Sequence, residues 1–357
     1  MRFRSGVVLT GFLLGAAGGA MAQTSGRPPV AMDSARARAL YVSNQHADHP
    51  ASNYAAAVTA KAATDSIFAA RSAGRMRYAK ISYQSSADGL EVPAYLFGPL
   101  QPRTEGHAAM IWVHGGVHGN WDQNYLPFLL EAVERGYVVI APDYRGSTGY
   151  GAEFHNLIDY GGKELNDVES AVDYLHTLPY VDRGRIGIMG WSHGGFITSH
   201  LLFRGADTRF RAGVAMVPVT NLIFRLSYKG PSYQRSFSTQ KDLLGLPFEQ
   251  RDEYVKRSPY YHIDKLEVPI LVHVATNDTD VNFEEDRQMI DGLIARKPQL
   301  AETKIYWDPP VGPAGGGHTF NRRVNRQTLE RDDSPEQIDS WNRVWAFFEW
   351  NLRPAGK

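Results

Sequence analysis

The hydrophobic positions from residue 78 onward fall into short runs separated by mixed segments. Two alternating stretches, 79–84 and 90–97, flank the turn Ala87-Asp88-Gly89 and predict an antiparallel hairpin. Six solid apolar runs follow, each of a length typical of a buried strand: 108–113, 137–141, 186–189, 212–217, 269–274 and 303–307. Because helix-compatible segments separate them, the pattern predicts an α/β fold, a doubly wound and mostly parallel sheet of about eight strands with helices on both faces.

Two of the intervening segments carry a clear helical period. Residues 163–178 place apolar side chains at helical spacing, and residues 341–352 form an aromatic-rich stretch that we expect to close the domain against the sheet. The segment 218–266 is too long for a simple connection. Insertions at the carboxyl ends of strands surround the ligand crevice in such sheets, so we interpret 218–266 as a cap or pocket insertion.

The first 76 residues differ in composition from the rest. Residues 1–22 combine a basic start, an apolar run and the small-residue site Ala20-Met21-Ala22, which predicts a secretory signal peptide cleaved after Ala22. We therefore expect a periplasmic or secreted protein, with an uncleaved N-terminal anchor as the alternative. Residues 23–76 are interpreted as a lead and a helical appendage, because 34–43 and 54–73 are alanine-rich and helix-prone.

Composition narrows the possible chemistry. The chain has no cysteine, which excludes disulfides, a thiolate nucleophile and Cys-ligated metal. Basic and acidic side chains number 38 each, and no basic stripe is present. This balance argues against nucleic acid and, after signal cleavage, against membranes as partners.

One motif predicts a nucleophile. The run Gly190-Trp191-Ser192-His193-Gly194 directly follows the strand 186–189 and precedes a helix-compatible stretch. A strand, G-x-S-x-G and a helix in this order form a nucleophile elbow, in which small residues on both sides of the serine permit a sharp turn. The alternative is a plain strand-to-helix turn with no catalytic role for Ser192.

A serine nucleophile needs a base and an acid, and both candidates follow later strands. His318 comes after Gly315-Gly316-Gly317 behind the strand 303–307. Asp278, Asp280 and Asp308 are the candidate acids, in that order of preference. The chain order Ser, Asp, His is the order this type of fold uses.

An oxyanion hole needs two hydrogen-bond donors. We expect one from the backbone amide of His193 and the other from the turn His114-Gly115-Gly116, which leaves the strand 108–113. His114 and His118 are spaced as H-x-x-x-H but lie on a glycine loop, and His193 and His200 have no carboxylate ligand between them. We therefore expect no metal site and no organic cofactor.

With these residues in place, the chain from about residue 79 onward resembles the catalytic domain of the prolyl oligopeptidase family (peptidase S9). The resemblance is carried by motifs at 86–95, 114–116, 143–151, 161–168, 180–188, 190–195, 277–281 and 317–320. It implies an α/β-hydrolase fold over 77–357, a Ser192–Asp278–His318 triad, and Asp278 in preference to Asp280, because the family places its acid three residues before a valine. The motifs also suggest pocket roles for Trp191, Tyr144, Arg145 and Tyr150, with plain loop packing as the alternative.

The sequence departs from the family pattern at several points. It has no counterpart of the family's β-propeller, whose acidic residues grip a free amino terminus, so dipeptidyl specificity is not implied. His114 stands where some members place an oxyanion-hole tyrosine, and Val117 replaces the usual proline. We therefore expect the second oxyanion donor to come from the backbone around Gly115.

These observations predict a serine hydrolase that works through an acyl-enzyme. The expected substrates are short peptides or aminoacyl derivatives, with small or aromatic carboxylic esters as the alternative. A non-catalytic binding module is a third interpretation, which the complete set of triad residues disfavours. We expect either a monomer or a homodimer.

Overall fold

The computed structural model describes residues 53–101, 103, 106–238, 245–310 and 317–353. The predicted signal peptide and the helix-prone stretch 34–43 lie outside these residues. Within the described ranges, no helix is long and apolar enough to cross a membrane.

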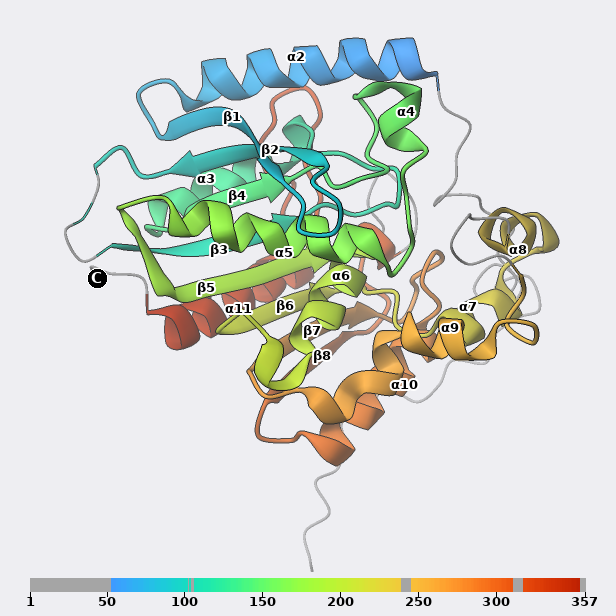
Figure 1. Cartoon of the computed structure of the whole chain (residues 1–357). Helices are drawn as coiled ribbons and strands as arrows, with labels where there is room; N and C mark the ends of the chain where they lie inside the picture. Colours follow the sequence, from blue (N-terminus) through green and yellow to red (C-terminus); the bar gives the residue numbers. More distant parts are fainter. Residues whose placement is uncertain (1–52, 102, 104–105, 239–244, 311–316, 354–357) are drawn as a thin grey trace, which may run out of the picture.

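An eight-stranded sheet forms the centre of the molecule (Figure 1). Its strands are β1 (Arg77–Gln84), β2 (Glu91–Gly98), β3 (His107–Val113), β4 (Val138–Pro142), β5 (Val181–Trp191), β6 (Ala212–Met216), β7 (Ile270–Ala275) and β8 (Ala301–Tyr306). They lie in the order β1-β2-β4-β3-β5-β6-β7-β8. β2 is antiparallel to both β1 and β4, and all other neighbours are parallel. The predicted hairpin and all six apolar runs are confirmed as strands.

Ten α-helices connect and cover these strands in the described residues: α2 (Tyr54–Ser72), α3 (Leu126–Glu134), α4 (Gly151–His155), α5 (Lys163–His176), α6 (His193–Leu202), α7 (Leu222–Tyr228), α8 (Pro231–Ser238), α9 (Arg251–Lys256), α10 (Phe283–Arg296) and α11 (Pro335–Leu352). Four short 3-10 helices accompany them: η1 (Gln123–Tyr125), η2 (Gly205–Asp207), η3 (Pro259–Lys265) and η4 (Gly317–Thr319). The two predicted helices, 163–178 and 341–352, correspond to α5 and α11.

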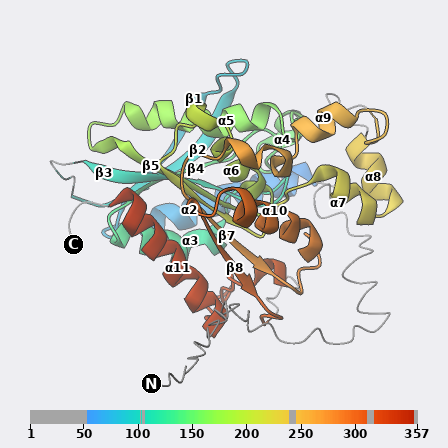
Figure 2. The same cartoon turned by 90° about the horizontal axis from the view of Figure 1, so that it is seen from below.

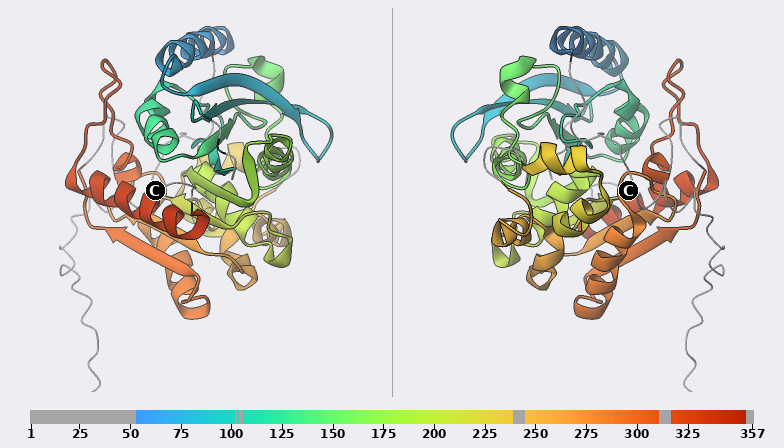
Figure 3. Two further views of the ribbon diagram at one scale, coloured as in Figure 1. Left: turned by 90° about the vertical axis from the view of Figure 1, so that its left-hand side faces the viewer. Right: turned by 90° about the vertical axis from the view of Figure 1, so that its right-hand side faces the viewer.

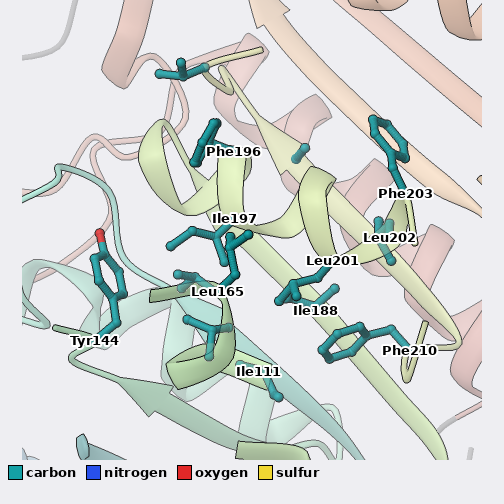
Figure 4. Packing of buried hydrophobic residues seen from close by; sticks show 14 of the residues in the cluster. Ile111, Tyr144, Leu165, Ile188, Phe196, Ile197, Leu201, Leu202, Phe203 and Phe210 are labelled. Carbon is teal, nitrogen blue, oxygen red and sulfur yellow. The ribbon is translucent and has the colours of Figure 1, made fainter. Parts of the chain in front are cut away.

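Two hydrophobic cores lie on opposite faces of the sheet. Side chains of α5, α6 and α10 contribute to one core, and side chains of α2, α3 and α11 contribute to the other. Figure 2 shows α5 and α11 on opposite sides of the strands. In Figure 4, Ile197 and Leu201 of α6 lie over Ile188 of β5 and Ile111 of β3, which fixes the helix that follows Ser192 against the sheet centre. The predicted two-sided covering is confirmed.

Helix α2 is more tightly integrated than the predicted appendage. Its Phe68 is fully buried and packs edge-to-face against Tyr95 and Phe97 of β2. Its Lys61 is also buried and forms an ion pair with Asp143. Sequence reasoning found the helix but not this packing, because the apolar positions of the segment are sparse and a buried lysine gives no apolar signal.

The segment 218–266 consists of α7, α8, α9 and η3 in its described part, and α7 begins soon after β6 ends. Figure 1 shows α7, α8 and α9 grouped beyond one end of the sheet. The end views in Figure 3 show α2 (blue) and β8 (orange) at opposite extremes of the molecule. Because α7 follows β6 and the strands β5, β6, β7 and β8 are parallel, their carboxyl ends lie at the end of the sheet where this insertion begins.

Candidate active site

Ser192 occupies a strained turn between β5 and α6. Its backbone has φ 54° and ψ −118°, and the residue is only 3% exposed. A Cβ on Gly190 or Gly194 would lie within 3.0 Å of backbone atoms, Gly194 being pressed against the carbonyl of Val113. Only glycine fits these two positions, as the G-x-S-x-G motif predicted. A serine held at positive φ by tight surroundings is typical of a functional turn.

His318 and Asp278 are brought together from loops that follow β8 and β7. The His318 Nδ1 atom lies 2.7 Å from Asp278 Oδ2. Asp278 is fully buried, and its other oxygen accepts the backbone N–H groups of Asp280 and Val281 at 2.8 and 2.9 Å. Three donors therefore fix the carboxylate, which in turn fixes the imidazole ring.

Gly317 makes this contact possible. A Cβ at this position would lie within 3.0 Å of the Asn277 side chain and of Ala275 Cβ. The Gly317 N–H also donates to the Asn277 carbonyl at 3.0 Å. The glycine before His318 therefore lets the loop after β8 close onto the end of β7.

The two rival carboxylates have other positions. Asp280 Oδ2 lies 3.5 Å from Nε2 of His318, the ring nitrogen opposite the one that Asp278 contacts. Asp308 is exposed and accepts a hydrogen bond from the Thr276 hydroxyl at 3.3 Å. The geometry thus favours Asp278 as the partner of His318 Nδ1 and places a second carboxylate, Asp280, near the reactive nitrogen.

The charges around His318 act on its protonation. Burial alone would lower the pKa of the imidazole, but the hydrogen bond and charge of Asp278, together with the charge of Asp280, outweigh burial and raise the pKa above its usual value. Arg322 opposes this effect weakly. The protonated form of His318 is therefore stabilised, which suits a group that must carry a proton briefly.

The residue before Ser192 is tied to the loop after His318. Trp191 Nε1 donates to Asn321 Oδ1 at 2.8 Å, and Trp341 of α11 donates to the Asn321 backbone carbonyl at 2.9 Å. Trp191 is fully buried. The elbow and the His318 loop are thus held in one arrangement by a buried hydrogen bond.

The predicted oxyanion turn lies directly against the elbow. A Cβ on Gly115 would lie 3.0 Å from the Trp191 carbonyl and 3.5 Å from Ser192 Cβ, so this position needs the close approach that glycine allows. The Gly115 N–H donates to the Tyr125 hydroxyl at 3.3 Å. His193 is the first residue of α6, where backbone N–H groups point out of the helix end.

The side chain of His114 is engaged inside the protein. It is fully buried, stacks on Tyr144, and its Nε2 lies 2.9 Å from the Ser147 hydroxyl. Burial lowers its pKa to about 4, against the charge of nearby Asp143, which raises it. Only the backbone of this turn is therefore placed for the predicted oxyanion role.

The polar atoms of Tyr144, Arg145 and Tyr150 have partners inside the protein, as the loop-packing alternative expects. Tyr144 is fully buried and donates to the Gly116 carbonyl at 2.7 Å, and Tyr150 donates to Asp143 Oδ2 at 2.6 Å. Arg145 is 2% exposed and forms ion pairs with Asp167 and Asp88. Neither Tyr144 nor Arg145 is placed to line a substrate pocket, since their polar atoms are engaged inside the protein.

The His193 imidazole is likewise buried rather than facing the substrate. It lies 3.6 Å from Glu164 and packs against Tyr160 and Phe196. Burial, with the charge of nearby Asp159, raises the pKa of Glu164 to about 8. The expected role of His193 therefore rests on its backbone amide alone.

A buried charged network joins the insertion to the site. Lys229 Nζ lies 2.8 Å from Asp280 Oδ1, and Arg225 donates to the Asp280 carbonyl at 3.2 Å. Arg225 also lies 3.7 Å from Glu285 of α10, whose carboxylate accepts the Tyr228 hydroxyl. α7 is thereby anchored to the loop that carries Asp278, a connection that the insertion's sequence pattern did not reveal.

Sequence reasoning missed Tyr125, Asn321 and Arg322. Asn321 and Arg322 follow the His318 motif directly, so extending that motif by two residues would have included them. Tyr125 lies ten residues beyond Gly115 and carries no motif. In the described part of the chain, no group of three or more potential metal ligands is arranged to hold an ion.

Known proteins with similar sequences and structures are peptidases. Residues 121–330, more than half of the chain, match the Prolyl oligopeptidase family. The chain is 32% identical over 262 residues to the Bacillus subtilis uncharacterized peptidase YuxL, covering 72% of this chain and 37% of that protein. It is 29% identical over 215 residues to the human acylamino-acid-releasing enzyme, and the match covers 58% of this chain and 29% of that enzyme.

Solved structures agree on the fold. The Pyrococcus horikoshii acylaminoacyl peptidase superimposes with a TM-score of 0.63 at 20% identity, covering 82% of this chain and 44% of that one. A puromycin-hydrolyzing peptidase of Mycobacterium tuberculosis superimposes with a TM-score of 0.61 at 22% identity, and the match covers 76% of this chain and 39% of that one. The chain spans about a third of the length of the two curated relatives. The chain belongs to the prolyl oligopeptidase family, and its domain has the α/β-hydrolase fold.

Proposed function

We propose that this protein is a serine peptidase in which Ser192, His318 and Asp278 form the catalytic triad. The observation that carries the proposal is the 2.7 Å contact between His318 Nδ1 and Asp278, made at the carboxyl ends of β7 and β8. Ser192 supports it from the end of β5, on a strained turn that is tied to the His318 loop through Trp191. The sequence order and the geometry thus point to the same three residues.

The proposed reaction has two steps. Ser192 Oγ attacks the acyl carbon while His318 Nε2 takes its proton, and the imidazolium then gives that proton to the leaving group. Water attacks the resulting acyl-enzyme, with His318 again acting as the base. Asp278 holds the Nδ1–H tautomer and stabilises the imidazolium charge without itself accepting the proton.

The backbone supplies the proposed oxyanion hole. The amide of His193 at the start of α6 is one donor, and the turn from His114 to Gly116 supplies the second. Each preorganised donor contributes about 3 kcal/mol of transition-state stabilisation in related sites. The close contact of Gly115 with Ser192 supports this assignment.

The proposed substrates are short peptides or aminoacyl derivatives. Support comes from the relatives, among which are an acylamino-acid-releasing enzyme and a dipeptidyl-peptidase 5. The panel that tests this proposal compares aminoacyl anilides with short- and long-chain nitrophenyl esters. We expect anilide hydrolysis that disappears in Ser192→Ala, whereas activity confined to the esters would assign the protein to the carboxylesterases.

We also propose that residues 1–22 direct the protein to the periplasm or the medium. The support is the basic start, the apolar run and the Ala20-Met21-Ala22 site. Expression in a bacterial host, followed by N-terminal sequencing of the protein from the periplasm, should give a chain that starts at Gln23. A cytoplasmic chain that retains Met1 would contradict this proposal.

A further inference from the structure

A pocket of about 320 Å³ lies beside the proposed catalytic residues. Gly115 and Tyr125 contribute to one wall, and Thr319 and Arg322 contribute to the other. Gly115 touches the elbow at Ser192, and Thr319 directly follows His318. The pocket is therefore adjacent to the oxyanion turn and to the loop of the proposed base.

Arg322 is the notable side chain of this pocket. Its guanidinium lies over the Trp191 ring, 5.2 Å from the ring centroid, and Nη1 donates to the Tyr125 hydroxyl at 3.3 Å. Within the described residues, no carboxylate oxygen lies within 4.0 Å of the guanidinium, and Nε is buried without a hydrogen-bond partner. The neighbouring Arg323, by contrast, is paired with Asp332 at 2.8 Å.

The charged side chains that line the pocket are Arg322, Arg326 and Asp122, so positive charge is in excess. The Asp122 carboxylate accepts the Asn124 N–H at 2.9 Å as the cap of η1, and burial raises its pKa while the charge of Arg322 acts in the opposite direction. Arg326 contributes a second, exposed guanidinium. Phe128 adds an apolar surface. A ligand with one anionic end and an apolar body would match these groups.

We propose that this pocket is a leaving-group subsite in which Arg322 binds a carboxylate of the substrate, such as the C-terminal carboxylate of a short peptide. The inference rests on the proposed function. A guanidinium fork matches a carboxylate with two parallel hydrogen bonds, and the contacts with the Trp191 ring and the Tyr125 hydroxyl hold the guanidinium in place in advance. The leaving group departs toward His318, whose loop forms the pocket wall. Peptides with a free C-terminus are therefore the preferred substrates.

Binding can be measured apart from catalysis. In the Ser192→Ala protein, calorimetric titration compares trialanine with trialanine carboxamide, which differ only in the terminal group, a charged carboxylate or a neutral amide. We expect the acid to bind about tenfold more tightly, the effect of one well-placed charge pair of about 1.4 kcal/mol. Adding Arg322→Gln should abolish this preference, and Arg322→Lys should restore part of it. Arg326→Gln, which removes a positive charge from the same pocket, should retain it.

Two results would overturn the inference: equal affinities for the two peptides, including no binding by either, or a preference that survives Arg322→Gln. Neither result bears on the triad, because hydrolysis of the neutral ester p-nitrophenyl acetate by the Ser192 protein reports on the proposed function separately. We expect Arg322→Gln to unfold at the same temperature as the unmodified protein, so that a lost preference reports on binding and not on folding.

Discussion

Trp191 Nε1 donates a 2.8 Å hydrogen bond to Asn321 Oδ1, joining two residues 130 positions apart. Trp191 immediately precedes Ser192, and Asn321 lies three positions after His318. The backbone carbonyl of Asn321 also accepts the indole N–H of Trp341. This pair of bonds fixes the position of the His318 loop relative to the nucleophile elbow, so we regard Asn321 as a positioning residue.

Trp191→Phe should therefore lower kcat, and the loss should exceed what its effect on the free energy of unfolding explains. The lost hydrogen bond is worth about 1 kcal/mol, and a loosened His318 loop should reduce kcat about three- to tenfold with little change in KM. Trp121→Phe is the matched control, because Trp121 is equally buried and donates its indole N–H to the Trp112 carbonyl at 3.1 Å. Equal kcat losses in both variants would show that the bond has only a structural role.

The two carboxylates near His318 should differ sharply in their effect on rate. Asp278→Asn removes the acceptor that orients His318 Nδ1–H and should cut kcat by about 10⁴. Asp280→Asn should cost less than about tenfold, because Asp280 contacts the other ring nitrogen. Steady-state kinetics on the two variants compares them directly, and the reverse ranking would transfer the acid role to Asp280.

Asp280 should instead set the pH range of activity. His318 must be neutral to accept the Ser192 proton, so the rate falls as pH drops through the pKa of His318. Since the two carboxylates raise this pKa, the acid limb of kcat/KM should lie above about 6.5, the usual value for imidazole. Asp280→Asn removes one of the raising charges and should move this limb to lower pH. A limb that stays in place would contradict the influence of Asp280 on His318.

The sequence predicted most of the helices and strands that position the site, but not the directions of several side chains near it. Solid apolar runs predicted six of the eight strands, because a strand buried on both faces needs a continuous apolar sequence, and two alternating stretches predicted the hairpin of β1 and β2. The motifs around Ser192, Asp278 and His318 were readable because their backbone geometry demands specific small residues. For Tyr144 and Arg145 the sequence left both pocket lining and loop packing open, because a motif gives the loop in which a side chain lies but not the direction in which it points.

Most other features that the sequence did not predict are polar contacts between residues far apart in the chain. Lys61 pairs with Asp143 across 82 positions of sequence, and Arg225 reaches Asp280 across 55. Neither pair has a local sequence signature, because which charges meet is decided by the packing of helices on the sheet. The Arg322 pocket could not be predicted from the sequence either, because it is lined by segments about 200 residues apart that only the packing of the fold brings together.

Three buried histidines should make the fold sensitive to acid. Burial lowers the pKa of His114 to about 4 and those of His200 and His273 to about 3. Between pH 6.5 and 4, the unfolded chain takes up protons at these sites and the folded protein does not. The free energy of unfolding should therefore fall as pH decreases, by up to about 1.4 kcal/mol per pH unit for each histidine.

His318 opposes this trend, because its pKa is raised and its contribution to stability is lost only as pH rises. Urea unfolding at pH 7.5 and pH 5.0 measures the net change. His200→Gln keeps a donor for the Arg257 carbonyl but removes one titrating group, so it should reduce the difference between the two pH values. An unchanged difference would show that His200 does not contribute to the acid sensitivity.

The most direct test of the proposed mechanism is covalent labelling by a fluorophosphonate, which reacts with a serine only when that serine is activated. Ser199→Ala is the matched control, because Ser199 is a buried serine of α6, the helix that begins directly after Ser192, and donates to the Gly195 carbonyl at 2.8 Å. We predict labelling of the unmodified protein and of Ser199→Ala, and none of Ser192→Ala. Equal labelling of Ser192→Ala and the unmodified protein would contradict the assignment of Ser192 as the nucleophile.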